Sequence, residues 1–279
     1  MFVSVFIFTH RIDFNNHIVS IVDDYLNSVF GGGCLKKTQK IVNKKKSFSV
    51  YESVLLILSH LLILTAFFIS PLVDAKTNIL STITSIVGTW GIIMISRGNY
   101  VAHYIYIVFS ILYSIVSITA NYYGEAIIYT FIMLPIHIFS AMSWKKNKVN
   151  SASNEVQVNK KNTKGHVVIS SVICTLLSVP FYFLLVALNT ENPICSTLSL
   201  STSVLAAYFM LKRIKFFSAI FAVDDILLLV LWGVQIFQGE YQYIPTLIVC
   251  VSLLINDAYS TMCWFKRSTK RNERNLPNV

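Results

Sequence analysis

Charged residues are scarce in this sequence. Only 13% of the 279 residues are Asp, Glu, Lys or Arg, whereas 54% are hydrophobic, and the mean hydropathy is +0.62. Soluble domains carry about 25% charged residues. Because the shortfall coincides with apolar runs of nearly twenty residues, the composition excludes an ordinary water-soluble globule and indicates a protein that crosses a membrane several times.

The motifs that would mark an enzyme or a metal site are also missing. The sequence contains no H-E-x-x-H, no G-x-S-x-G and no P-loop pattern. Its five cysteines are scattered without a C-x-x-C, so they imply neither a disulfide framework nor a zinc site. The first apolar stretch lacks the flanks of a signal peptide. We therefore expect a protein that is not an enzyme and that uses no cofactor and no metal.

Eight apolar segments can be counted along the chain. They are residues 51–70, 78–96, 101–120, 124–144, 166–188, 196–211, 216–237 and 242–264. A helix needs about 20 residues to cross the hydrocarbon core, and in lipid the backbone can satisfy its hydrogen bonds only within helices or closed barrels. The sixth segment is short and needs help from its flanks or neighbours. The sequence predicts an all-α integral membrane protein with eight transmembrane helices.

Basic residues concentrate in alternate loops. With eight spans, one side receives nearly all of them, including Lys44, Lys145, Lys212 and Lys266, while the loops of the other side hold only Lys76. Acidic residues, among them Glu125 and Glu240, are assigned to the loops of that other side. The positive-inside rule then places both termini in the cytoplasm. The formal net charge of +10 is thus a topology signal, and nucleic acid is not an expected partner.

Two stretches of the chain resemble each other. Each starts with Met, has Arg three residues later, crosses the membrane once and closes with Gly-Glu, at Glu125 and at Glu240. Each is followed by a span that ends in Trp near basic residues, and we expect these two, Trp144 and Trp264, to lie at the membrane interface. The pattern predicts a 1+3+1+3 plan in which two three-helix bundles are parallel repeats with a site between them.

This plan divides the chain into six segments. They are a cytoplasmic N-terminal extension at 1–48, an additional transmembrane helix at 49–75, a first three-helix bundle at 76–148, a cytoplasmic loop and linking helix at 149–190, a second three-helix bundle at 191–268 and a cytoplasmic tail at 269–279.

Polar residues interrupt the apolar runs at one depth. Asp225 and Asp257 each lie nine or ten residues from a basic residue, or about 15 Å into the membrane at 1.5 Å per residue, and His137 lies at a similar depth. A charge there costs at least ~2.5–3.5 kcal/mol, so these side chains are expected to face a cavity; a clamp between helices is the alternative, at ~0.6 kcal/mol per contact. Of Asp224 and Asp225, one is expected to face the cavity and the other a neighbouring helix.

Aromatic and amide side chains share the faces of these acids. Trp232 follows Asp225 by two helical turns, and Tyr259 follows Asn256 by three residues. Aromatic faces stack on planar rings and attract cations, while amides and carboxylates bond to sugar hydroxyls. The set suits a neutral or cationic ring that carries hydroxyls. The predicted binding residues are Asp225, Trp232, Gln235, Asn256, Asp257, Tyr259 and His137.

These motifs resemble the PnuC-type nicotinamide riboside transporter family. The resemblance covers residues 50–268 and rests on the repeat landmarks, on "DILLLVLW" and on "NDAYSTMCW", which contains an N-x-x-Y. It implies a SWEET-like fold, a homotrimer, and substrate contacts from N-x-x-Y and from a W-x-x-W/F element. Here the latter reads Trp232-Gly233-Val234-Gln235, so glutamine replaces the second aromatic residue. Relatives carry thiamine, deoxynucleosides or riboflavin, which therefore remain open as substrates.

The function that follows is uptake of nicotinamide riboside through a bacterial plasma membrane by alternating access, driven by intracellular phosphorylation. Trp232 would stack on the base, Asn256 and Tyr259 would orient it, and Asp225 or Asp257 would hold ribose hydroxyls. Three alternatives stay open: a carrier coupled to ions through its membrane acids, an intramembrane enzyme, and a sensor or scaffold that binds without transport.

Overall fold

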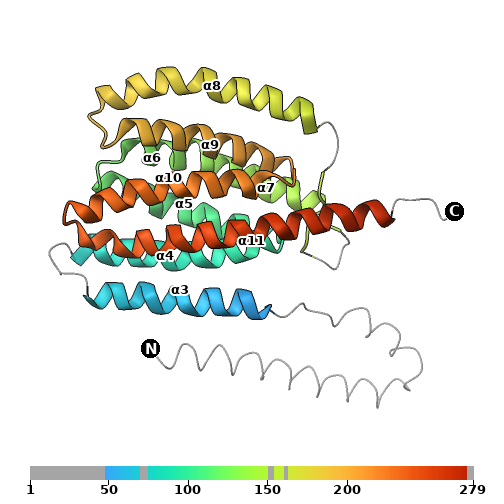
Figure 1. The fold of residues 1–279 in the computed structure, drawn as a ribbon, viewed down its shortest axis with the longest axis horizontal. Helices are drawn as coiled ribbons and strands as arrows, with labels where there is room; N and C mark the ends of the chain where they lie inside the picture. Colours follow the sequence, from blue (N-terminus) through green and yellow to red (C-terminus); the bar gives the residue numbers. More distant parts are fainter. Residues whose placement is uncertain (1–47, 70–74, 150–153, 160–162, 275–279) are drawn as a thin grey trace, which may run out of the picture. The chain divides into compact units, whose positions relative to one another are not determined.

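The computed structural model describes residues 48–69, 75–149, 154–159 and 163–274. The chain divides between residues 48 and 49, and the description concerns residues 49–279; most of the predicted N-terminal extension and the last five residues of the predicted tail lie outside the described residues. The described part is helical apart from isolated β-bridges. Its helices are α3 (Val50–Ile69), α4 (Ala75–Ser96), α5 (Ala102–Thr119), α6 (Tyr123–Ile127), η2 (Ile128–Met133), α7 (Leu134–Lys146), α8 (Thr163–Ala187), α9 (Pro193–Leu211), α10 (Phe217–Phe237), η3 (Tyr241–Tyr243) and α11 (Ile244–Arg274) (Figure 1).

The eight predicted spans are confirmed. In the described residues, eight helical segments are long and apolar enough to cross a membrane, and each overlaps one predicted span. The last helix is longer than its predicted apolar segment, 242–264, because α11 continues to Arg274. Lys, Arg and Glu are good helix formers, so the helix extends beyond its apolar segment.

The fourth span is not a regular α-helix. It consists of α6, the π-helical turn η2 and α7, and Pro135 lies in the first turn of α7. Proline has no backbone N–H and clashes with the carbonyl one turn earlier, so it disturbs the regular ladder just before it. A π-helical turn of this kind is frequent at functional sites. The irregularity identifies this span as one to inspect for function.

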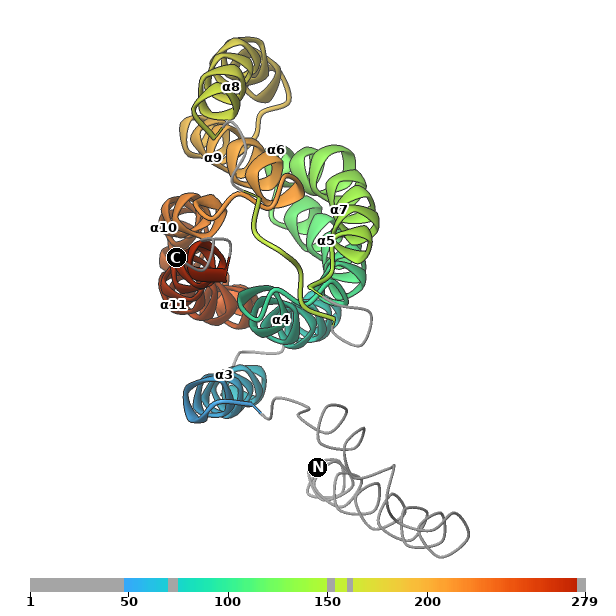
Figure 2. The same cartoon turned by 90° about the vertical axis from the view of Figure 1, so that its right-hand side faces the viewer.

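Six of the spans form a ring when viewed along their axes (Figure 2). Around the ring come α4, α5, the α6–η2–α7 span, α9, α10 and α11, and α11 packs back against α4. The remaining two spans lie outside the ring, with α8 against α9 and α3 against both α4 and α11. Because α3 and α8 lie outside the ring, a central site would be surrounded by the six spans of the ring.

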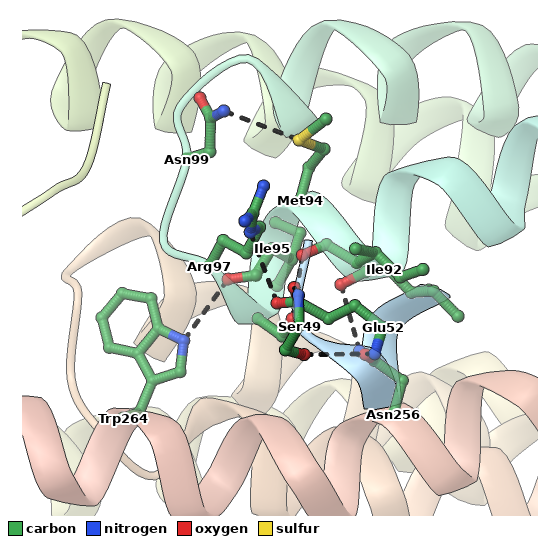
Figure 3. Close-up of polar contacts among 11 residues, drawn as sticks. Ser49, Glu52, Ile92, Met94, Ile95, Arg97, Asn99, Asn256 and Trp264 are labelled. Carbon is green, nitrogen blue, oxygen red and sulfur yellow. Dashed lines mark hydrogen bonds and ion pairs between the residues drawn. The ribbon is translucent and has the colours of Figure 1, made fainter. Parts of the chain in front are cut away.

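Polar contacts hold the additional helix α3 against the ring. Its first turn is a capping box, in which the Ser49 N–H donates to Glu52 Oε2 at 2.7 Å and the Glu52 N–H donates to Ser49 Oγ at 3.2 Å. Glu52 Oε1 also lies 3.3 Å from Nε of Arg97, which follows α4 (Figure 3). Farther along, the hydroxyls of Ser59 and Ser252 are 2.7 Å apart. Helix α3 is therefore fixed at specific points on both α4 and α11.

A short segment between α7 and α8 crosses one end of the ring (Figure 2). This segment, residues 154–159, is called the strap below, and the end it crosses is the strap end. The Val156 N–H donates to the Gly98 carbonyl at 2.9 Å, and the Asn159 N–H donates to the Arg213 carbonyl at 2.9 Å. The strap thus joins the turn after α4 to the turn after α9.

The strap end is filled by buried apolar side chains. Val156 and Val158 are each only 3% exposed. They pack into one hydrophobic cluster that comprises Ile95, Ala102, Trp144, Val156, Val158, Phe209, Met210, Ile214, Phe217 and Trp264. The ring is therefore closed at this end by the strap and by the final turns of four spans.

The prediction that Trp144 and Trp264 lie at the membrane interface is wrong. Both side chains are fully buried, and their ring centroids are 5.4 Å apart. The Trp144 Nε1–H donates to the Met210 carbonyl at 2.9 Å, and the Trp264 Nε1–H donates to the Ile95 carbonyl at 3.4 Å (Figure 3). Ring closure and the strap bring these helix ends inside the protein, so each tryptophan finds its hydrogen-bond acceptor there instead of in water.

Helix α6 approaches α8 and α9 closely at Gly124. A methyl group there would come 2.9 Å from Cβ of Ser196 and 3.1 Å from Cδ1 of Leu185, whereas one at Gly233 meets nothing within 4 Å. We expect Gly124→Ala to lower the free energy of unfolding by about 1–3 kcal/mol because the contact is already tight. Gly233→Ala should not lower it, since alanine is the better helix former. Thermal unfolding in detergent measures both, and equal melting temperatures would contradict this packing.

Candidate functional site

A small cavity lies inside the ring, beneath the strap-end cluster. Its volume is about 40 Å³, and every span of the ring contributes to its wall. The lining residues are Ile95, Tyr106, Phe109, Tyr129, Met133, His137, Met210, Phe221, Asp224, Asp225, Leu253 and Asp257. A larger hollow of about 340 Å³ lies on α8 and α9, but it is open and lined almost wholly by apolar surface. The enclosed cavity is the one that combines acids, an imidazole and aromatic walls.

Three carboxyl groups reach this cavity. Asp224 accepts hydrogen bonds from the hydroxyls of Thr202, at 2.9 Å, and Ser203, both on α9. Asp225 is 3% exposed, and its Oδ2 has no hydrogen-bond partner among the described residues. Asp257, on α11, is 7% exposed. Both residues of the Asp224–Asp225 pair line the cavity, and the one that also meets a neighbouring helix is Asp224.

His137 enters the cavity wall from α7. Its Nδ1 lies 3.2 Å from Nδ1 of His103 on α5, and its ring stacks on Tyr106 with centroids 4.8 Å apart and an angle of 10° between the ring planes. Nε2 of both histidines lacks a hydrogen-bond partner within the described residues. The structure thus brings together three of the predicted residues, His137, Asp225 and Asp257, around one space.

Trp232 and Gln235 lie outside the cavity lining, at the end of the ring opposite the strap. The Trp232 Nε1–H donates to the Tyr113 hydroxyl at 2.7 Å, and its ring meets Tyr122 edge-on with centroids 5.3 Å apart. Tyr243 packs on the same indole at 5.3 Å. Gln235 Nε2 donates to the Ala120 carbonyl at 3.3 Å. Trp232, Tyr113, Tyr122 and Tyr243, all buried, are called the far cluster below.

Asn256 and Tyr259 also lie outside the lining, because they sit on other faces of α11. The Asn256 Nδ2–H donates to the Ile92 carbonyl of α4 at 3.0 Å (Figure 3). Tyr259 stacks on Tyr51 of α3 with ring centroids 4.1 Å apart. Successive helical residues are about 100° apart, so Asn256 and Tyr259 are rotated by about 100° and about 200° from Asp257. These two residues contact neighbouring helices in this structure.

The family of this chain is now identifiable. The model of the family described as "Nicotinamide mononucleotide transporter" matches residues 78–266, a range that includes the whole ring except the outermost turns. The chain belongs to the nicotinamide mononucleotide transporter family. The match begins at residue 78, so α3 precedes the region that the family model covers.

Individual relatives of the nicotinamide mononucleotide transporter family agree with this assignment. The chain is 24% identical over 193 residues to the "Nicotinamide riboside transporter PnuC" of Neisseria mucosa, which covers 67% of this chain and 72% of the relative. It superposes on the "Crystal structure of the Vitamin B3 transporter PnuC" with a TM-score of 0.69 and 22% identity, covering 80% of this chain and 94% of that one. The fold is thus one of a multi-pass membrane transporter family.

In this member of the nicotinamide mononucleotide transporter family, several cavity residues were missed from sequence. Tyr106 and Phe109 line the cavity from α5, and Tyr129 and Met133 line it from η2. The spacing of Tyr129, Met133 and His137, four residues apart, was the available signal, since helical residues at this spacing share a face. They read as ordinary apolar membrane residues because nothing in the sequence distinguishes an inward aromatic face from a lipid-facing one.

Glu125 was interpreted from sequence as an acidic loop residue, and that interpretation is wrong. It lies in α6, is fully buried, and has no hydrogen-bond partner for either carboxyl oxygen among the described residues. Its counterpart in the sequence repeat, Glu240, is exposed. The loop before α6 folds inward onto α9, so one end of the repeat is buried and the other is not.

Proposed function

We propose that this protein carries nicotinamide riboside across a bacterial plasma membrane. The observation that carries the proposal is the enclosed cavity with three carboxyl groups and four aromatic rings in a ring of membrane-length helices. Membership of a transporter family supports it, as does the similarity to the nicotinamide riboside transporter of Neisseria mucosa. A planar ring with a sugar matches aromatic walls that stack and carboxyl groups that accept hydrogen bonds from hydroxyls.

The proposed mechanism is alternating access. A cavity of about 40 Å³ has room for only a few water molecules, at about 10–15 Å³ each, so a nucleoside needs it to widen. The strap-end cluster closes it on one side, and the far cluster lies beyond it on the other. Opening these two layers in turn would expose the cavity to each side without a continuous pore. Transport would be facilitated diffusion, with phosphorylation inside the cell removing the product.

The architecture we propose is a 1+3+1+3 plan with two parallel, SWEET-like three-helix repeats. Supporting it, Trp144 near the end of one repeat bonds to the end of α9, and Trp264 near the end of the other bonds to the end of α4. The positive-inside distribution of Lys and Arg supports a cytoplasmic strap end and cytoplasmic termini, which protease protection of tagged termini tests. A homotrimer is proposed from the family resemblance, and the mass of the purified particle tests it.

The predicted site residues take three roles in this proposal. Asp225, Asp257 and His137 contact the substrate from the cavity wall. Trp232 and Gln235 form part of the layer that opens opposite the strap, where Trp232 stacks on the base as it passes. Asn256 and Tyr259 hold α11 to α4 and α3, and they orient the substrate through the position of Asp257 on the same helix.

Counterflow in proteoliposomes tests the function. Vesicles loaded with unlabelled nicotinamide riboside should accumulate the labelled compound transiently, and protein-free vesicles should not. Thiamine, riboflavin and deoxynucleosides serve as competitors, and the one that competes best identifies the substrate if it is not nicotinamide riboside. Collapse of exchange when a proton or sodium gradient is removed would favour the ion-coupled alternative. Absence of exchange with every one of these compounds would overturn the transporter proposal.

A further inference from the structure

The cavity is acidic without compensation. Asp224, Asp225 and Asp257 line it, and within the described residues its lining contains no Lys or Arg. Asp224 and Asp225 are adjacent on α10, and Asp257 joins them from α11. His137 is the remaining titratable side chain of the wall apart from the phenols of Tyr106 and Tyr129. The cavity lining therefore holds three acidic side chains and no basic side chain of Lys or Arg beside them.

Asp224 and Asp225 differ in how their carboxyl groups are hydrogen-bonded. Asp224 is already held by Thr202 and Ser203, so its oxygens are occupied by α9. Asp225, by contrast, is 97% buried and keeps one oxygen without a hydrogen bond. A buried carboxyl oxygen without a hydrogen-bond partner is unfavourable, and a positive charge beside it is one arrangement that offsets this cost. A ligand in the cavity can supply such a charge.

The rest of the wall fits the same ligand. Tyr106, Phe109, Tyr129 and Phe221 line the cavity with aromatic rings beside the acids, and an aromatic face attracts a cation, more strongly when water is excluded. Flat rings also favour a flat ligand. A compact ammonium ion would satisfy the acids but would leave these walls without a stacking partner.

We propose that Asp225 and Asp257 make this cavity selective for ligands that carry a fixed positive charge on an aromatic ring. The inference rests on the proposed function and specifies the substrate class of the same site. A neutral molecule of the same shape leaves the acids unpaired, and a phosphorylated one brings negative charge towards them. Selectivity is thus set by charge as well as by shape.

A pair of ligands that differ in charge tests this directly. Nicotinamide riboside carries a pyridinium charge, whereas its 1,4-dihydro form is neutral and keeps the carboxamide and the ribose. We expect the charged form to bind the purified wild-type protein at least tenfold more tightly, measured by calorimetry, with thiamine as an unrelated aromatic cation that also binds. Equal affinities for the two forms of the riboside would overturn the inference while leaving the proposed function intact.

Conservative substitutions then test whether Asp225 and Asp257 cause the preference for the charged ligand. Asp225→Asn and Asp257→Asn should each reduce the preference for the charged form at least tenfold, with the affinity for the neutral form retained. Glu240→Gln, which removes an exposed acid outside the ring, is the matched control and should keep the preference. If thiamine binds through Asp225 but nicotinamide riboside does not bind, the proposed function fails and the charge selectivity stands. If both Asn variants keep the full preference, the charge selectivity fails.

Discussion

Replacing Trp264 by alanine is expected to lower the free energy of unfolding by about 3–5 kcal/mol, the usual range for removing a buried tryptophan from a core. The side chain is fully buried. Its indole packs against Trp144 at 5.4 Å and against Phe217 at 4.8 Å between ring centroids, and its Nε1–H donates to the Ile95 carbonyl. Alanine would leave a cavity at the place where the indole now packs against Trp144 of α7 and Phe217 of α10. Denaturant or thermal unfolding of the detergent-solubilised protein measures the loss.

The matched control is a large side chain that faces outward. Phe237 is 94% exposed and Phe131 is 73% exposed, so Phe237→Ala and Phe131→Ala should change the free energy of unfolding by no more than about 0.5 kcal/mol. A tryptophan at the membrane interface would behave like these two residues. Stability losses of equal size in Trp264→Ala and in both controls would therefore restore the interfacial assignment and remove the buried cluster.

Placing two carboxylates in the strap is expected to open the strap end of the cavity. Val156→Asp with Val158→Asp puts charges where side chains are 3% exposed, and a buried unpaired carboxylate is unfavourable by several kcal/mol. The strap should leave the cluster for water. The reporter is Met210→Cys in a chain whose five native cysteines are replaced by alanine, because Met210 lies in both the cluster and the cavity wall. We expect its labelling by a membrane-impermeant maleimide to become at least tenfold faster.

The control is a substitution at Gln157, the residue between Val156 and Val158. Gln157 is half-buried, and its side chain donates to the Lys148 carbonyl at 3.2 Å, outside the apolar cluster. Gln157→Glu therefore adds one charge to the same segment without entering the core. The labelling rate of the Met210→Cys reporter should stay unchanged in this variant. If the doubly charged strap also leaves the rate unchanged, the strap does not close the cavity.

The spans could be predicted because each is a local property of the chain. A continuous run of about twenty apolar residues in lipid satisfies its own backbone hydrogen bonds as a helix, so the number and positions of the helices followed from residues such as those of 101–120 and 216–237. The π-helical turn before Pro135 was not predicted, since proline permits several distortions and the neighbouring helices choose among them. The strap was not predicted either, because the alternation of 154–159 is too short to indicate a buried segment and its valines are buried only by side chains from distant helices.

The acids of the candidate site could be predicted from their unfavourable surroundings. A carboxylate in a long apolar run needs an interior position, which led to Asp225 and Asp257. The residues around them were harder to assign. Asn256 and Tyr259 lie within two residues of Asp257 in the sequence, yet Asn256 faces α4 and Tyr259 faces α3, because a helix distributes neighbouring residues over all its faces. The sequence assigned Glu125 to a loop, whereas the structure places it in α6, which packs against α9.

The sequence by itself determined that this is a membrane protein of eight helices with acidic side chains buried at mid-depth, because the bilayer penalises charge and unpaired backbone at every position regardless of what packs nearby. Only the tertiary structure decided which side chains share the cavity, that Trp144 and Trp264 are core residues, and that the strap closes one end. Those outcomes depend on the rotation of each helix about its axis and on contacts between segments far apart in the chain, and neither quantity is encoded in any local stretch of residues.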